Sequence, residues 1–254
     1  MEETKKIDGN SCRQEELILK PTAIYGFADP SGNLLIPYQW WLAQNFSEGL
    51  AAVKDKNGKW GYIDKTGKVV IPCQWKYADS FSEGLAVVWD TNDLWGFIDK
   101  TGTVVVPCQW KYAHDFSEGI ACVKGDNDKY GFVDKSGEVV IPCQWRYAKS
   151  FSEGLAAVMD NSCKDGFIDK SGRMVIPCEW TFADDFHEGL AAVSDNNHKW
   201  GFIDITGKVV IPCKWTSISY FQNGYAQVWD TQGDDRELTI DRYGNIIEDE
   251  QPEK

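Results

Sequence analysis

Few residues of this 254-residue chain have the types and spacing that catalysis requires. The three histidines, His114, His187 and His198, stand in unrelated contexts and form no metal-binding pair of the HExxH kind. The sequence contains neither a G-x-S-x-G nucleophile motif nor a phosphate-binding glycine loop. We therefore expect a protein that is not an enzyme, with no catalytic residues.

Carboxylates are the only abundant side chains in the sequence that could act as an acid or a base. Asp184 and Asp185 are adjacent, and a Glu recurs once every 35 residues as Glu48, Glu83, Glu118, Glu153 and Glu188. A glycosidase needs two carboxylates about 5–10 Å apart in one cleft. A Glu that recurs at a single phase is better explained as a hydrogen-bond acceptor in a turn or connector. A hydrolase that uses Asp184 or Asp185 is the enzymatic alternative.

Metal and cofactor sites are not expected either. The Asx-rich loops 126–128 and 195–197 offer oxygen ligands for Ca²⁺, but they lack a terminal Glu at EF-hand spacing. Asn and Asp favour turns without any metal. We predict that these loops are turns and that the chain holds no metal and no cofactor.

Five of the eight cysteines share one phase of the sequence: Cys73, Cys108, Cys143, Cys178 and Cys213. Equivalent positions in stacked sheets lie about 10 Å apart, whereas a disulfide needs Cα atoms within about 7 Å. We expect half-buried free thiols, a buried Cys122 and exposed Cys12 and Cys163. Reduced thiols favour a cytoplasmic location. A secreted chain trimmed of its signal would look the same, because the polar N-terminus shows no signal segment.

The elements that position these residues come from a repeat of 35 residues. The segment 60–88 (WGYIDKTGKVVIPCQWKYADSFSEGLAVV) recurs along most of the chain. Its first two residues return at constant spacing as Trp95-Gly96, Tyr130-Gly131, Asp165-Gly166 and Trp200-Gly201, and are preceded by Tyr25-Gly26. A fixed period of this size predicts a solenoid, a propeller or an array.

Each unit predicts three strands, exemplified by 85–88, 95–99 and 103–106. The tight link 99–102 (DKTG) suits a type I turn followed by a left-handed glycine. A proline then ends the third strand, because it has no N–H to donate. Both faces of the strands are apolar, which favours sheets covered on both sides by their neighbours. A glycine such as Gly61 beside a large aromatic indicates close approach of another element, and the recurrent Trp75 and Phe81 indicate connector anchors.

The predicted fold is therefore all-β, a tandem array of seven three-stranded antiparallel units with a 35-residue period. It begins with a strand at Glu15–Lys20 and is curved as either a propeller-like ring or an open superhelical β-solenoid. We expect a flexible leader at 1–14, a single domain at 15–248 and an acidic tail at 249–254.

The net charge of −13, from 39 acidic and 26 basic residues, argues against nucleic-acid binding. No apolar stretch approaches the length of a membrane span, so we expect no membrane insertion.

The unit resembles the WG-containing repeat, also called the KWG repeat, which is found in many bacterial proteins. The resemblance rests on Lys59–Gly67 (KWGYIDKTG), Val70–Pro72 (VIP) and Phe81–Ala86 (FSEGLA), and it covers about residues 20–250. The hallmark Trp is missing at Tyr25, Tyr130 and Asp165. The resemblance implies a β-repeat scaffold attached to varied partners and brings no catalytic motif.

Function is then expected where the copies differ. The loops 54–59, 89–94, 124–129, 159–164 and 194–199 vary within a constant frame, and on a repeat scaffold they line one edge. We predict a non-catalytic scaffold that binds a protein or peptide through this edge; the alternative is a glycan-binding, lectin-like repeat protein. Trp89 and Trp229 are either exposed anchors or caps of the core. The candidate partner-binding residues are Trp89, Asp93, Asp126, Asp128, Asn161, Asn196, His198 and Trp229.

Overall fold

The computed structural model describes residues 24–230 and 236–247, and their regular secondary structure consists of β-strands. The chain divides into two compact units, Met1–Ser80 and Phe81–Lys254. The predicted leader, the predicted strand Glu15–Lys20, Cys12 and the predicted tail lie outside the described residues. Within the described ranges, no helix is long and apolar enough to cross a membrane. The predicted all-β class is confirmed.

The first unit contains a two-stranded sheet, β1–β2, and a four-stranded antiparallel sheet in the order β3–β4–β5–β6. A short strand, β7, ends it. The strands are β1 (Tyr25–Ala28), β2 (Leu34–Trp40), β3 (Leu42–Ala43), β4 (Leu50–Lys54), β5 (Trp60–Asp64), β6 (Val69–Trp75) and β7 (Tyr77–Ala78).

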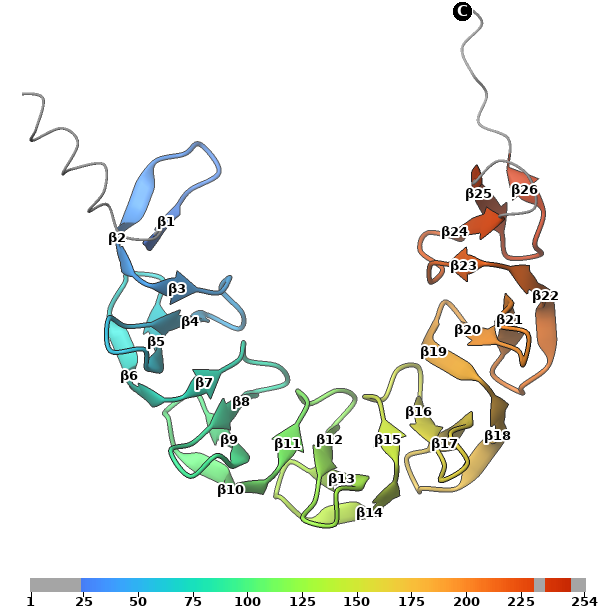
Figure 1. Cartoon of the computed structure of the whole chain (residues 1–254). Coiled ribbons are helices and arrows are strands. Elements are labelled where there is room, and N and C mark those ends of the chain that lie inside the picture. The colour runs from blue at the N-terminus through green and yellow to red at the C-terminus, as the bar shows by residue number, and fades with distance from the viewer. Residues whose placement is uncertain (1–23, 231–235, 248–254) are drawn as a thin grey trace, which may run out of the picture. The chain divides into compact units, whose positions relative to one another are not determined.

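The second unit continues with five further sheets, each made of strands that follow one another in the chain (Figure 1). The first of these contains β8 (Leu85–Trp89), β9 (Trp95–Asp99) and β10 (Val104–Trp110). The next two contain β11 (Tyr112–Ala113), β12 (Ile120–Lys124), β13 (Tyr130–Asp134) and β14 (Val139–Trp145), then β15 (Tyr147–Ala148), β16 (Leu155–Met159), β17 (Asp165–Asp169) and β18 (Met174–Trp180). The last two contain β19 (Phe182–His187), β20 (Leu190–Ser194), β21 (Trp200–Asp204) and β22 (Val209–Trp215), then β23 (Ser217–Ile218), β24 (Tyr225–Asp230), β25 (Arg236–Asp241) and β26 (Ile246–Ile247). Within this unit the sheets follow a curve and do not close on themselves (Figure 1).

The predicted tight turn joins the second and third long strands of each sheet. In the link 134–137, the Gly137 amide donates to the Asp134 carbonyl at 3.0 Å, and Gly137 has a φ of 87°. The Asp134 carboxylate accepts the Ser136 amide at 2.8 Å and the Glu138 amide at 3.0 Å. An Asp at the first position and a left-handed glycine at the fourth therefore build this turn, as predicted.

The sheets have one strand more than the three predicted. The connector that follows each third strand contributes a short fourth strand, such as β11, whose Tyr112 and Ala113 pair with Lys124 and Val123 of β12. Two residues are too few to leave a periodic pattern in the sequence, so this strand was missed.

The third strand also continues past the proline that was predicted to end it. In β14, Pro142 lies within Val139–Trp145, and the register with β13 shifts between the pairs Phe132↔Ile141 and Tyr130↔Trp145. β14 is the edge strand of its sheet, and a bulge at an edge accepts a proline. A Cβ on Gly131 would lie 2.5 Å from the carbonyl oxygen of Ile141, so the glycine admits this bulge. The close approach predicted for the repeated glycine is confirmed.

The first two long strands are covered on both faces as predicted, but the third is not. Ala156 and Ala157 of β16 are both buried, whereas Val139 and Val140 of β14 are 46% and 39% exposed. Only Ile141 of that strand's apolar run is buried, with 1% exposure. The third strand is the outer edge of the sheet, and its bulge breaks the alternation from which two covered faces were predicted.

The hydrophobic core lies between successive sheets. A Phe in the second long strand packs against the Phe of the following connector, as in Phe132–Phe151, whose ring centroids lie 4.9 Å apart. The connector Trp and Phe side chains are largely buried, with Trp110 and Phe116 at 8% and 2% exposure. The prediction that the recurrent Phe anchors the connector is confirmed, whereas the Trp that was predicted in the connector is the last residue of the third strand, as Trp110 is in β10.

The recurrent Glu ties one repeat to the next. In the second unit, Glu83, Glu118, Glu153 and Glu188 accept the backbone N–H of Gly119, Gly154, Gly189 and Gly224, respectively. Lys135 and Lys170 reach Glu83 and Glu118 from the following sheet at 3.1 and 3.0 Å. The predicted acceptor role in the connector is confirmed for these four residues.

Candidate functional site

The variable loops join the first and second long strands, so they lie at the sheet end opposite to the tight turns. Each is fixed by its own hydrogen bonds. In the loop 159–164, the Asp160 carboxylate accepts the amides of Ser162 at 2.8 Å and Lys164 at 3.0 Å. The hydrogen bond from the Ser162 hydroxyl is the main cause that lowers the pKa of Asp160. The loop backbone is therefore held in one shape.

Neighbouring loops of the second unit are joined through two of the predicted residues. Lys129 Nζ donates to Asn161 Oδ1, and Lys164 Nζ donates to Asn196 Oδ1. Three successive loops thus form one continuous edge. Asn161 and Asn196 hold that edge together by side chains that also remain exposed.

Asp126 and Asp128 lie at the exposed tip of the loop 124–129. Asp128 forms ion pairs with Lys111 at 3.3 Å and with Lys124 at 3.2 Å. The hydrogen bond from Lys124 is the largest of the causes that lower the Asp128 pKa. Asp126 contributes its backbone carbonyl, which accepts Lys111 Nζ at 2.8 Å, and leaves its carboxylate at the surface.

Asp93 and His198 occupy the last position of their turns. Their φ values are 66° and 57°, and Asp128 and Cys163 at the same phase have φ values of 60° and 62°. All four are exposed. Their backbone conformation closes the loop, and their side chains differ from one loop to the next.

Trp89 is the last residue of the first long strand of its sheet, Trp229 is the last but one, and both are half-buried. The Trp89 ring stacks on that of Trp95 at a centroid distance of 5.8 Å and an angle of 11°. The backbone carbonyl of Trp229 accepts the Thr216 hydroxyl at 2.8 Å. Trp89 thus packs on the first residue of the second strand of its sheet.

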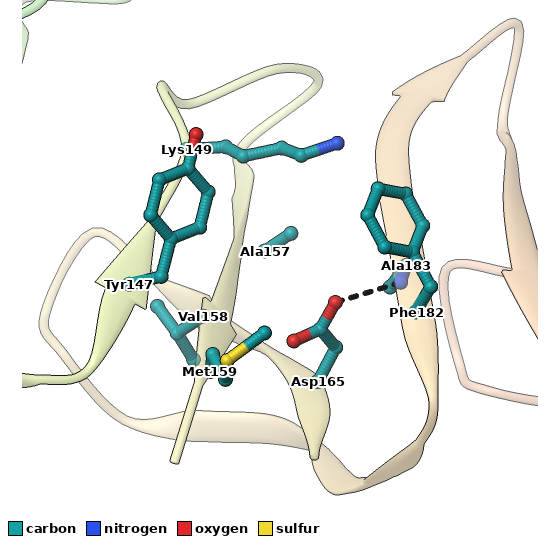
Figure 2. A pocket seen from close by; sticks show the side chains of 8 residues that line it. All are labelled: Tyr147, Lys149, Ala157, Val158, Met159, Asp165, Phe182 and Ala183. Atoms are coloured by element: carbon teal, nitrogen blue, oxygen red, sulfur yellow. Dashed lines mark hydrogen bonds between the residues drawn. The ribbon is translucent and has the colours of Figure 1, made fainter. Parts of the chain in front are cut away.

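The structure adds one site that the sequence analysis did not predict. In three other repeats, the first residue of the second long strand has an aromatic ring that packs on a ring 17 residues further on: Trp60–Tyr77, Trp95–Tyr112 and Tyr130–Tyr147, with 5.2 Å between the ring centroids of the last pair. In β17 this position is Asp165. A cavity of about 30 Å³ remains where a ring would lie, walled by Tyr147, Met159 and Phe182 and by small side chains of β16 and β19 (Figure 2).

Asp165 is the polar floor of this cavity, which we call the Asp165 pocket. The residue is only 6% exposed. Its Oδ2 accepts the Ala183 amide at 2.9 Å, whereas Oδ1 is buried without a hydrogen-bond partner among the described residues. Figure 2 shows Oδ1 turned away from Ala183 toward the side of Met159. Burial raises the pKa of Asp165, because the charged form loses its hydration.

Lys149 also lines the Asp165 pocket, and it forms an ion pair with Asp184, which directly precedes Asp185. Lys149 Nζ lies 2.6 Å from Asp184 Oδ1 and 4.9 Å from the centroid of the Phe182 ring. Burial works against the charged form of Asp184, but the hydrogen bond from Lys149 outweighs it and the Asp184 pKa is lowered. Burial raises the pKa of Asp185, whose Oδ1 has no partner in the described part of the chain. Asp184 and Asp185, the carboxylates of the hydrolase alternative, thus have pKa values shifted in opposite directions, and Asp184 is held in an ion pair.

The sequence did carry a signal for the Asp165 pocket. Asp165 departs from the Trp or Tyr that the other copies have at this phase. A buried carboxylate in place of a ring leaves empty space and an acceptor oxygen without a hydrogen bond. Neither property can be read from the sequence alone.

The comparison with protein families decides how the repeat is classified. The family described as WG containing repeat matches residues 25–60, 60–88, 95–130, 130–162, 166–197 and 200–228. The chain belongs to the WG-containing repeat family. The matches confirm the resemblance seen in the sequence. Asp165 lies in the gap between the match that ends at 162 and the match that begins at 166.

Comparison with curated protein sequences finds no match to this WG-repeat chain. Among solved structures, it is similar to a eukaryotic initiation factor at 11% identity, with 88% of this chain and 70% of the other covered and a TM-score of 0.60. It is also similar to the computationally designed Ika8 protein (12% identity, 85% and 77% covered, TM-score 0.52) and to Hsv2p of Kluyveromyces lactis (9% identity, 82% of each chain covered, TM-score 0.51). At these identities the similarity shows the fold alone. Sheets of four antiparallel strands in sequence are the blade type of β-propellers.

Proposed function

We propose that this WG-repeat chain is a non-catalytic scaffold that binds a protein or peptide partner along its loop edge. The observation that carries the proposal is the chain of contacts from Lys129 to Asn161 and from Lys164 to Asn196. These contacts join three loops into one surface. A peptide that crosses several loops then meets a single site rather than separate tips.

The loop edge is also prepared for binding. Each loop is held by hydrogen bonds to the carboxylate or amide at its start, as at Asp160 and Asp195. Binding to a preformed backbone avoids the free-energy cost of ordering it. The exposed side chains on this fixed frame differ at the last position of the turn, as between Asp93 and His198. A constant frame with variable tips is how repeat scaffolds encode different partners.

The glycan alternative receives less support. It required aromatic rings that recur around the array at the surface, to stack on sugars. The Trp and Phe rings that recur in every repeat are largely buried, as with Trp110 and Phe116, and the partly exposed rings of Tyr112, Tyr147 and Phe182 recur at one phase in only part of the array. The half-buried Trp89 and Trp229 stand in only two loops.

A peptide-display selection on the full chain tests the proposal. We expect a defined set of peptides whose affinity falls at least tenfold with Asp126→Lys or His198→Asn. Glu138→Lys is the matched control, because Glu138 is an exposed acid in the tight turn at the opposite end of β13. Equal losses with Glu138→Lys, or no selected peptide at all, contradict the proposal. A glycan array that gives specific binding sensitive to Trp89→Ala, in the absence of peptides, would favour the alternative.

A further inference from the structure

The Asp165 pocket lies at the loop edge, and its volume suits a small polar group such as an ammonium group. Asp165 directly follows the loop 159–164, and Met159 directly begins it. The cavity of about 30 Å³ compares with the roughly 10–15 Å³ that one water-sized group requires. It therefore accepts an ammonium group and an adjoining methylene.

The floor of the pocket lacks a hydrogen-bond donor. Asp165 Oδ1 is buried without a partner among the described residues, while Oδ2 is occupied by the Ala183 amide. A buried carboxylate is costly unless it is both hydrogen-bonded and paired with a charge. A water molecule would supply only the hydrogen bond. A cationic donor supplies both.

The local charge also calls for a cation. Among the described residues, the ammonium group of Lys149 pairs with Asp184, and its charge opposes the effect of burial on the carboxyl groups of Asp165 and Asp185. Lys149 is engaged by Asp184 and lies over the Phe182 ring, so it does not serve Asp165 Oδ1. A metal ion is a poor match, since no group of three His, Cys, Asp or Glu residues suited to a metal occurs in the described ranges.

The walls suit an aliphatic stem. The rings of Tyr147 and Phe182 stand on opposite sides of the Asp165 pocket, with Met159 and Asp165 below them and the aliphatic stem of Lys149 across the top (Figure 2). Tyr147 and Phe182 are 39% and 41% exposed, so these walls reach the surface. Aromatic faces attract ammonium groups and pack well on the methylenes of a lysine.

We propose that the Asp165 pocket binds the side chain of a lysine in the partner peptide, with the ammonium group on Asp165 Oδ1 and the methylenes between Tyr147 and Phe182. This inference rests on the proposed peptide-binding function and adds an anchor residue to it. The exposed side chains of the loops then contact the peptide residues on either side of that lysine.

The chain carries its own reporter for this site. It has three methionines, Met1, Met159 and Met174, and Met159 alone lines the Asp165 pocket among the described residues. Methyl-¹³C-methionine labelling of the full chain lets NMR follow each methyl group. The probe is Nα-acetyl-lysine N-methylamide, and the matched control is the norleucine analogue, which has no ammonium group.

We expect the lysine probe to shift the Met159 signal saturably and to leave Met174 in place. Asp165→Asn keeps the shape of the side chain but removes its charge, and we expect at least tenfold weaker binding. Asp165→Trp restores the ring that other repeats have, and we expect no binding. The amide spectrum of each variant checks that it is folded.

Three outcomes overturn the inference: an equal response to the norleucine analogue, unchanged affinity in Asp165→Asn, or no saturable shift up to roughly 100 mM probe. The two proposals fail separately. Selected peptides that lose affinity with Asp126→Lys but contain no required lysine leave the loop-edge function standing and remove the lysine pocket. A lysine probe that binds at Asp165 while no peptide is selected does the reverse.

Discussion

The Glu118 carboxylate accepts the backbone N–H of Gly154, one repeat and one residue further along, at 3.0 Å. Glu118 makes this contact from a left-handed backbone conformation with a φ of 53°. A residue other than glycine pays a steric cost for that conformation. The same φ and the same contact occur at Glu83, Glu153 and Glu188. The side chain therefore offsets the strain by linking neighbouring repeats.

Replacement of Glu118 by Ala is expected to lower the free energy of unfolding by about 1–2 kcal/mol, because it keeps the unfavourable φ and loses a hydrogen bond to a charged group. Chemical denaturation followed by tryptophan fluorescence measures the change. Glu138→Ala, at an exposed acid of the tight turn, is the control and is expected to change stability by less than about 0.5 kcal/mol. Equal effects of the two substitutions would show that the hydrogen bond from Gly154 to Glu118 does not contribute to stability.

Much of the fold could be predicted because the period is regular. The Asp-to-Gly turns, the doubly covered first strands and the buried connector rings all follow from patterns repeated in several copies. The course of the third strand could not be predicted, because Pro142 reads as a strand end unless its bulge opposite Gly131 is known. The fourth strand was missed because it has only two residues in most sheets, as in β11.

The candidate site was predicted less completely than the fold. The sequence identified the variable loops, but it could not show that Asn161 and Asn196 bind lysines of neighbouring loops, since those contacts depend on how sheets stack. Asp165 was noticed only as a departure from the repeat. Its burial, and the cavity beside it, depend on the rings of Tyr147 and Phe182 in two different sheets.

Gly131→Ala is expected to destabilise the protein by roughly 2–4 kcal/mol. The new Cβ would lie 2.5 Å from the Ile141 carbonyl oxygen and 2.7 Å from the Cys143 amide nitrogen, and backbone atoms in a sheet have little freedom to move. Gly125→Ala is the comparison, because its Cβ meets side-chain atoms at 3.2 Å or more. Thermal unfolding of both variants gives the answer. A loss at Gly131 no larger than at Gly125 would contradict the role assigned to the bulge.

The cysteines are expected to differ in their reaction with a maleimide at pH 8. Cys163 is exposed, whereas burial raises the pKa of Cys73, Cys108 and Cys178 to about 11. Only about one in a thousand of those thiols is then the reactive thiolate. Peptide mass spectrometry of briefly labelled native protein should find Cys163 modified first and the other three far more slowly. Rapid labelling of all four would count against their burial.

Asp165→Trp is expected to raise the midpoint of thermal unfolding of the free protein at neutral pH, because the ring fills the cavity and a buried charge is removed. Asp165→Asn removes the charge alone and should give a smaller gain. The sign of the pH dependence follows from the raised pKa of Asp165, whose protonated form is the one that folding favours. The destabilisation by Asp165 is therefore absent below its unfolded pKa of about 4 and grows as pH rises through the folded pKa. Unfolding midpoints of wild type and Asp165→Asn should converge as pH falls toward 4 and separate at pH 7. A difference that is constant across this range would mean that Asp165 carries no buried charge.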